Sequence, residues 1–178
     1  MKDLKHISKF LSLVLRHKPE EIEVAMDAQG WVNVDELIGK CNQSNNKLDF
    51  EMLEEVVVTS DKQRFAFNDD YTKIRANQGH TVNVDLQFEP TEPIEFLYHG
   101  TAEKFINEIK SNGLQKIQRL HVHLSKDLET AVKVGTRRGK PVILKIRAAE
   151  MHLAGYSFYL SQNGVWLCNE VPAKYIEF

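Results

Sequence analysis

The stretch Arg64–Ala76, RFAFNDDYTKIRA, decides the fold of the N-terminal half of the chain. On either side of Asp69 and Asp70, the segments RFAFN and YTKIRA alternate apolar and polar residues. Alternation with a period of two is typical of strands, and a short acidic segment between two strands is typical of a turn. The stretch therefore predicts a β-hairpin.

Three helical patterns precede this hairpin. Apolar residues at spacings of three and four run from Leu4 to Leu15, and Pro19 ends that helix. The second helix follows Asn33 and the third follows Asp49, each a side chain that caps helix N-termini. Three helices followed by a hairpin is the order of the winged-helix fold, a relative of helix-turn-helix.

The pattern changes after QFEPTEPIEF, which contains two prolines and predicts a linker at about residues 88–94. Strands are expected at FLYHGT, HVHLS and PVILKIRA, and helices at AEKFINEIKSNG and DLETAVKVGTRRG. We expect Gly113 to close the first of these helices and Ser125 to cap the second. YLSQNGVWL predicts a hairpin with Asn163 and Gly164 in a type I′ turn. The predicted fold class is α+β.

Composition limits the class of protein. The 178 residues are 42% hydrophobic and 27% charged, as expected for one or two globular domains. No apolar run approaches the roughly 18 residues of a membrane span, and MKDLKHISKF lacks the apolar segment of a signal peptide. Cys41 and Cys168 have no paired spacing, so neither a disulfide framework nor a cysteine-rich zinc site is expected. We expect a cytoplasmic protein that has no membrane partner.

The charge is unevenly divided between the two halves. Residues 1–90 carry 11 Lys and Arg against 16 Asp and Glu, whereas residues 91–178 carry 12 against 9. Neither half has the basic excess of a generic duplex binder. Any nucleic-acid contact must therefore use a few well-placed cations, and no obligate protein partner is evident from the sequence.

The segment LRHKPE places Arg16 and His17 on the last turn of the first predicted helix. Cations at a helix C-terminus offset the macrodipole by about 0.3–1 kcal/mol each. Arginine and histidine side by side are also suited to holding a phosphate and moving a proton. These residues alone leave both interpretations open.

The tetrapeptide YHGT suits a nucleotide site. His99 can hydrogen-bond a ribose hydroxyl, Gly100 permits close backbone approach, and Thr101 adds a hydroxyl. A tight strand-to-helix turn in which Thr101 caps the following helix is equally consistent with these residues.

In HVH, His121 and His123 lie on one face of a strand and could form a metal pair with His99 as a third ligand. The spacing is too weak to predict a zinc site, and at least one of these histidines is expected to be a hydrogen-bonded packing residue. GxGxxG, GxxxxGK[ST] and HExxH are absent from the sequence, so Rossmann, P-loop and zincin folds lack their usual support.

Eight motifs in order resemble the NAD-dependent RNA 2′-phosphotransferases over residues 7–176. They are SKFLSLVLRHKPE, GWVNVDELI, SDKQRFAF, IRANQGHT, LYHGT, HVHLS, VGTRRGKPV and NGVWL. The resemblance implies a winged-helix RNA-binding lobe at 1–88 and an NAD-binding, ADP-ribosyltransferase-like mixed α/β lobe at 94–178.

The activity implied by the resemblance is removal of an internal RNA 2′-phosphate, as found at a ligated tRNA splice junction, with NAD⁺ as co-substrate and no metal. In the family's first step the 2′-phosphate attacks the anomeric carbon of the nicotinamide ribose, expels nicotinamide and gives an RNA-2′-phospho-ADP-ribose intermediate. The ribose 2″-hydroxyl then attacks the phosphate and releases 2′-hydroxyl RNA and ADP-ribose 1″,2″-cyclic phosphate.

Matching the motifs residue by residue carries the family's catalytic set onto Arg16, His17, Arg64 and Arg119. The NAD⁺ contacts fall on His99, Gly100, Thr101, His123, Ser125, Arg137, Asn163, Gly164, Val165 and Trp166. The family's G-x-R-H-G pattern has arginine at its fourth position here, so the role of Arg138 stays open, as does that of His80.

Two other hypotheses remain at this stage. One is an ADP-ribosyltransferase that caps terminal phosphates of RNA or DNA. The other is a winged-helix nucleic-acid binder without activity, against which the acidic first half and the intact Arg-His and HGT motifs argue. Modification of a protein acceptor is disfavoured because NGVWL lacks the carboxylate that many such transferases use.

Overall fold

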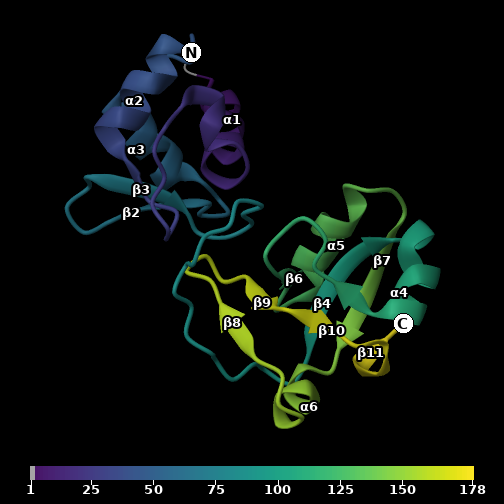
Figure 1. Cartoon of the computed structure of the whole chain (residues 1–178). Helices are drawn as coiled ribbons and strands as arrows, with labels where there is room; N and C mark the ends of the chain where they lie inside the picture. The colour runs from purple at the N-terminus through teal and green to yellow at the C-terminus, as the bar shows by residue number, and fades with distance from the viewer. Residues whose placement is uncertain (1–2) are drawn as a thin grey trace. The chain divides into compact units, whose positions relative to one another are not determined.

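The computed structural model describes residues 3–178, which fold into two compact units divided between Gln87 and Phe88 (Figure 1). Residues 1 and 2, with which the predicted first lobe begins, lie outside the described residues. Each unit combines helices with antiparallel strands around an apolar core, so the prediction of an α+β fold is confirmed. Within residues 3–178, every helix is too short or too polar to cross a membrane.

The N-terminal unit follows the predicted order of helices and hairpin. Its helices are α1 (Leu4–Arg16), η1 (Pro19–Ile22), α2 (Val34–Gln43) and α3 (Phe50–Thr59). Its strands are β1 (Val32–Asn33), β2 (Phe65–Phe67) and β3 (Lys73–Ala76), which form an antiparallel sheet in the order β1-β3-β2. The core lies between the three α-helices and this sheet, where Leu11, Leu37, Leu53 and Ile74 are fully buried.

The caps explain where these helices begin. The side chain of Asn33 accepts from the backbone N–H of Glu36, and that of Asp49 accepts from Met52, at 2.9 and 2.8 Å. Each cap of this kind stabilises a helix by about 1 kcal/mol. Both caps were predicted from the sequence and are confirmed.

The C-terminal unit contains more strands. Its helices are η2 (Glu103–Phe105), α4 (Ile106–Asn112), α5 (Leu128–Thr136), α6 (Ala148–Leu153) and η3 (Ala173–Tyr175). Its strands are β4 (Leu97–Ala102), β5 (Leu114–Gln115), β6 (Val122–Leu124), β7 (Pro141–Ile146), β8 (Phe158–Leu160), β9 (Trp166–Cys168), β10 (Glu170–Val171) and β11 (Ile176–Glu177). They pair as β11-β7-β4, β6-β9-β8 and β10-β5, all antiparallel.

Two local predictions in this unit are wrong. Asp127, not Ser125, caps α5, because the Asp127 carboxylate accepts from the backbone N–H of Thr130 at 2.7 Å. The turn between β8 and β9 is not type I′, which needs positive φ at both central residues. Only Gly164 in this turn has positive φ, +80°, and the N–H of Gly164 donates to Ser161 O. Gly113, with φ +72°, does close α4 as predicted.

The segment predicted as a linker makes contacts within the C-terminal unit. Pro90 forms an isolated bridge with Tyr159, and the N–H of Thr91 donates to Phe158 O at 2.8 Å. Main-chain hydrogen bonds therefore attach this part of residues 88–94 to β8.

Both cysteines are free and buried, one in each unit. Burial raises the pKa of Cys41 to about 11 and that of Cys168 to about 12. Both thiols therefore stay protonated and pack as small apolar side chains.

Candidate active site

Arg16 and His17 lie at the C-terminal end of α1. Arg16 is the last helical residue, and the backbone N–H of His17 donates to Leu13 O as the helix ends. Pro19 follows at the start of η1 and cannot continue the helix. Both side chains are half-buried, and the negative end of the helix dipole favours a cation in this place.

A six-residue segment, Asn77–Val82, connects this helix end to Arg64. The N–H of Thr81 donates to Arg16 O, and the N–H of Asn77 donates to Arg64 O, both at 2.9 Å. Four residues of extended chain span at most about 14 Å. The N-terminal unit therefore brings Arg16, His17 and Arg64, three of the predicted catalytic residues, into one neighbourhood.

The Asn77–Val82 segment also packs against the Arg16 side chain. Gly79 has φ +90°, and a Cβ built on it would lie 3.5 Å from Arg16 Cζ. His80, only 1% exposed, follows in the buried interior. Burial, and then the charges of Arg16, Arg75 and His17, lower the pKa of His80 to about 4, so this imidazole is neutral near pH 7. His80 thus contributes a neutral ring beside the cations.

His99 begins the predicted nucleotide motif on β4, where it pairs with Leu144 of β7. Its Nδ1–H donates to the carbonyl of His123 on β6 at 2.9 Å. Burial lowers the pKa of His99, the hydrogen bond to His123 opposes that shift, and the charge of Arg138 adds to it. A neutral ring that donates through Nδ1 carries its lone pair on Nε2, which can accept from a hydroxyl.

Gly100 and Thr101 have structural roles that the sequence did not predict. A Cβ on Gly100 would lie 1.8 Å from Ala131 O, so the close approach that glycine permits here is that of helix α5. Thr101 is buried within β4 opposite Val142. The alternative in which Thr101 caps the following helix is wrong, because η2 has no side-chain cap.

Ser125 aligns β4 with the HVHLS strand. Its backbone exchanges two hydrogen bonds with Tyr98, at 2.7 and 2.8 Å, in an isolated bridge between the two three-stranded sheets. His99 is the next residue after Tyr98, and His123 lies on β6 just before the bridge. His99, His123 and Ser125 therefore lie close together at one junction of the C-terminal unit.

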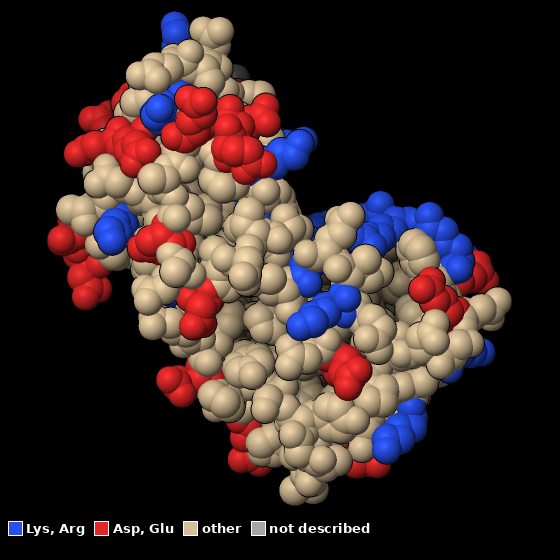
Figure 2. All heavy atoms as spheres, viewed as in Figure 1, with Lys and Arg blue, Asp and Glu red and all other residues tan. Residues whose placement is uncertain are grey.

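Arg119 belongs to a group of cations that includes Arg137 and Arg138. Partial burial, followed by the charges of Arg138 and Arg137, lowers the pKa of Arg119. Among residues 3–178, none of these three guanidinium groups lies within 4 Å of a carboxylate oxygen. Arg138 also lowers the pKa of His99, so this cluster adjoins the nucleotide motif. Figure 2 shows Lys and Arg side chains gathered along one edge of this unit.

The loop from Ser161 to Val165 carries the remaining predicted contacts. Asn163 accepts from the hydroxyl of Ser161 at 2.5 Å, and the N–H of Val165 donates to the same hydroxyl at 3.0 Å. Trp166 starts β9 and is 6% exposed within the unit's apolar core. The hydrogen bonds to the Ser161 hydroxyl thus stabilise the turn that contains Asn163, Gly164 and Val165. Trp166 contributes mainly to packing.

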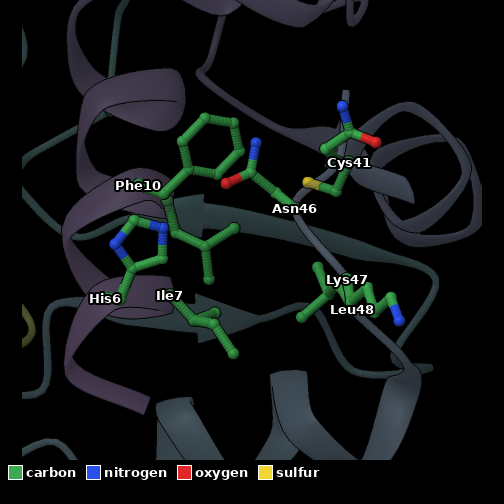
Figure 3. A pocket seen from close by; sticks show the side chains of 9 residues that line it. His6, Ile7, Phe10, Cys41, Asn46, Lys47 and Leu48 are labelled. Carbon is green, nitrogen blue, oxygen red and sulfur yellow. The ribbon is translucent and has the colours of Figure 1, made fainter. Parts of the chain in front are cut away.

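Three further observations concern groups outside the predicted site. His121 packs edge-on against Tyr159, with 5.6 Å between the ring centroids, so the packing part of the expectation for HVH is confirmed. No group of three potential His, Cys, Asp or Glu ligands occurs within residues 3–178. The hollow in Figure 3 lies between α1 and the end of α2, lined by residues such as Phe10, Cys41 and Leu48, and contains none of the predicted site residues.

The geometry thus supplies two sets of groups suited to anions. The N-terminal unit offers two arginines with a histidine, and the C-terminal unit offers three arginines beside a neutral histidine acceptor. The backbone N–H groups of Thr81 and Asn77 bind the carbonyls of Arg16 and Arg64 in the first set. No role for Thr81 or Asn77 was predicted from the sequence. Both lie within the IRANQGHT motif, but the resemblance assigned a role to neither of them.

Comparison with known proteins assigns the chain. The family model described as "RNA 2′-phosphotransferase, Tpt1 / KptA family" matches residues 2–170. A "Probable RNA 2′-phosphotransferase" of Flavobacterium johnsoniae is 59% identical over 174 residues, 98% of this chain and 96% of that protein. Proteins of the same description from Nostoc punctiforme and Hahella chejuensis are 53% and 51% identical, over 96% and 98% of this chain and 94% of each of those proteins. The chain therefore belongs to the RNA 2′-phosphotransferase Tpt1/KptA family of NAD⁺-using enzymes.

Proposed function

We propose that this RNA 2′-phosphotransferase moves an internal RNA 2′-phosphate to NAD⁺ through the two-step reaction with an RNA-2′-phospho-ADP-ribose intermediate. Membership of the family carries the proposal. It is supported by Arg119, Arg137 and Arg138, which have no carboxylate oxygen within 4 Å among residues 3–178, because such guanidinium groups suit ligands with several negative charges.

In this proposal Arg16, His17 and Arg64 bind the RNA 2′-phosphate, and Arg119 is the fourth member of the catalytic set. A phosphate monoester carries about −1.5 to −2 charge near pH 7, so it is already a nucleophile and needs positioning more than deprotonation. Guanidinium groups bind phosphate through two N–H donors and keep their charge. Each charge-assisted hydrogen bond contributes about 1.5–3 kcal/mol.

The second step builds more charge on phosphorus than the first, so it gains more from preorganised donors. We expect Arg119 to act mainly there. His17 can donate to a phosphate oxygen or carry a proton from the attacking hydroxyl. Nicotinamide leaves as a neutral molecule, so its departure needs no acid.

The C-terminal unit holds NAD⁺ in this proposal. His99 Nε2 is free to accept from a ribose hydroxyl because Nδ1 is committed to His123 O. Arg137 suits the pyrophosphate, with which it would form charge-assisted hydrogen bonds. The other residues proposed to form the NAD⁺ site are Gly100, Thr101, His123, Ser125, Asn163, Gly164, Val165 and Trp166. Gly100 acts indirectly, by letting α5 pack against β4.

The two units suit the two substrates. We propose that residues 1–88 form a winged-helix RNA-binding lobe and residues 94–178 an ADP-ribosyltransferase-like lobe. The order of three helices and a hairpin supports the first assignment. An RNA with an internal 2′-phosphate, as in a ligated tRNA splice junction, is the proposed substrate. Two free thiols suit a reducing compartment, which supports a cytoplasmic location.

One assay tests the function. The protein is incubated with NAD⁺ and a short RNA that carries an internal 2′-phosphate, and the matched RNA with a 2′-hydroxyl is the control. We expect conversion to 2′-hydroxyl RNA with release of ADP-ribose 1″,2″-cyclic phosphate, and the same rate in EDTA, because guanidinium groups supply the positive charge.

Two outcomes would contradict the proposal. An ADP-ribose cap on a terminal phosphate, with the internal 2′-phosphate intact, would indicate the alternative transferase. Absence of NAD⁺ consumption with any phosphorylated RNA or DNA would indicate a binding protein.

A further inference from the structure

Thr81 forms hydrogen bonds with both Arg16 and His17 at the end of α1. Its backbone N–H donates to Arg16 O at 2.9 Å, and its hydroxyl Oγ1 lies 3.0 Å from His17 Nδ1. Thr81 and His17 are 64 residues apart in sequence and both are half-buried. The contact is therefore a tertiary one, made by the fold.

We propose that Thr81 is a positioning residue that orients the imidazole of His17 for the phosphotransferase reaction. The inference rests on the function proposed above. His17 is the C-cap of α1, with φ −127° and ψ −45°, and has left the regular helix. One hydrogen bond to Nδ1 fixes the ring of such a residue and directs Nε2 away from Thr81.

A hydroxyl is the suitable partner because it can donate and accept. When His17 is protonated, Nδ1–H donates to Oγ1. When His17 is neutral, the Thr81 hydroxyl can donate to Nδ1, which leaves the proton on Nε2. In both arrangements Nε2–H remains a donor, which a phosphate oxygen can accept. A carboxylate partner would instead favour the charged form of the ring.

Thr81 is itself held in place. Asn77 binds the Arg64 loop at two points, since its N–H donates to Arg64 O and its Nδ2 donates to Gln63 O at 2.6 Å. His80, next to Thr81, is buried in the core. A β-branched residue also has few side-chain rotamers. The hydroxyl is therefore presented from a fixed backbone by a stiff side chain.

The test compares Thr81→Val, which removes the hydroxyl but keeps the shape, with Thr81→Ser, which keeps the hydroxyl. Single-turnover assays with 2′-phosphate RNA and NAD⁺ resolve the two steps. We expect Thr81→Val to slow the step that His17→Ala slows, by about tenfold, as for loss of an orienting hydrogen bond. Its KM for NAD⁺ and its urea midpoint should match wild type, and Thr81→Ser should restore most of the rate.

A double-mutant cycle with His17→Ala completes the test. We expect Thr81→Val to have no further effect once His17 is absent. A tenfold loss in both backgrounds would overturn the inference, since Thr81 would then act without His17. A wild-type rate in Thr81→Val would overturn it as well. Failure of the wild-type protein to remove the 2′-phosphate would instead contradict the proposed function, so the two failures are distinguishable.

Discussion

Arg119 lies near Arg137 and Arg138, and the three positive charges repel one another in the free protein. An anion that binds among them gains its own attraction and also relieves this repulsion. A guanidinium group in such a cluster is therefore most valuable at the stage where the ligand carries most charge. In the proposed reaction that stage is the attack of the ribose hydroxyl on phosphorus.

We predict that Arg119→Ala accumulates RNA-2′-phospho-ADP-ribose, because the second step loses more stabilisation than the first. Gel analysis of labelled RNA with time would show the intermediate forming and persisting. Arg119→Lys, which keeps the charge but loses the two-pronged donor, should restore only part of the second-step rate. Arrest of nicotinamide release would instead place Arg119 in the first step, and full activity would remove it from the site.

We predict that the lowered pKa of His80 makes the free energy of unfolding depend on pH. An unfolded histidine takes up a proton near pH 6.5, whereas the buried ring of His80 resists protonation until about pH 4. Stability is therefore complete above pH 6.5 and falls as the pH falls toward 4, by at most about 3 kcal/mol from this residue. His99 and His121, whose pKa values are also lowered, contribute in the same direction.

Urea unfolding at pH 7.0 and 4.5, compared between wild type and His80→Gln, measures this contribution. We expect the variant to lose less stability on acidification than the wild type does. Equal losses in the two proteins would show that His80 titrates in the fold as it does in the unfolded chain.

At the scale of elements, the contact between α5 and β4 shapes the C-terminal unit. Gly100 and Gly135 meet there, since a Cβ on Gly100 would also lie 2.7 Å from Gly135 N. Helix and strand backbones thus touch without side chains between them. This contact places the residues that follow α5, Arg137 and Arg138, near the strand that carries His99.

We predict that Gly100→Ala destabilises the protein by more than about 3 kcal/mol, the upper end of ordinary overpacking, because backbone atoms must move. Gly39→Ala is the control, since Gly39 is exposed within α2 and its Cβ would meet nothing within 4 Å. That change should stabilise the protein by up to about 1 kcal/mol. Urea unfolding followed by circular dichroism measures both, and an unchanged midpoint in Gly100→Ala would contradict the packing argument.

Elements with local causes were predictable from the sequence. Asn33 and Asp49 cap their helices because the capping bond is made within three residues, and Gly113 closes α4 by its own backbone conformation. Ser125 is not a cap, because α5 begins at Leu128 and is capped by Asp127. The Ser125 backbone instead pairs with Tyr98, which is distant in sequence. The attachment of Arg16 and Arg64 to the Asn77–Val82 segment is tertiary too, so no local pattern indicated it.

At the scale of the whole molecule, the charge distribution limits how RNA can be bound. Residues 1–90 have more acidic than basic side chains, and Figure 2 shows acidic groups spread over the N-terminal unit. General attraction to a phosphate backbone is therefore weak in this unit. Discrimination then depends on the few arginines that hold the 2′-phosphate.

We predict a shallow salt dependence of binding to 2′-phosphate RNA. With three or four phosphate contacts, the slope of log K against log salt should be about −2 to −3, since each contact to single-stranded nucleic acid contributes about −0.7. Fluorescence anisotropy titrations at salt concentrations from about 50 to about 300 mM measure this slope. Arg64→Ala should remove about one contact and so make the slope shallower by about 0.7. Equal affinity for 2′-hydroxyl RNA would show that the arginines do not discriminate the 2′-phosphate.

The buried thiols of Cys41 and Cys168 make the protein convenient for site-specific labelling. With pKa values of about 11 and 12, neither thiol forms the thiolate that reacts with maleimides near pH 7. If one cysteine is introduced on the exposed surface of each unit, these two would be the only reactive thiols within residues 3–178. A donor and acceptor dye at those positions would report, by energy transfer, how the distance between the two units responds to NAD⁺ and to RNA.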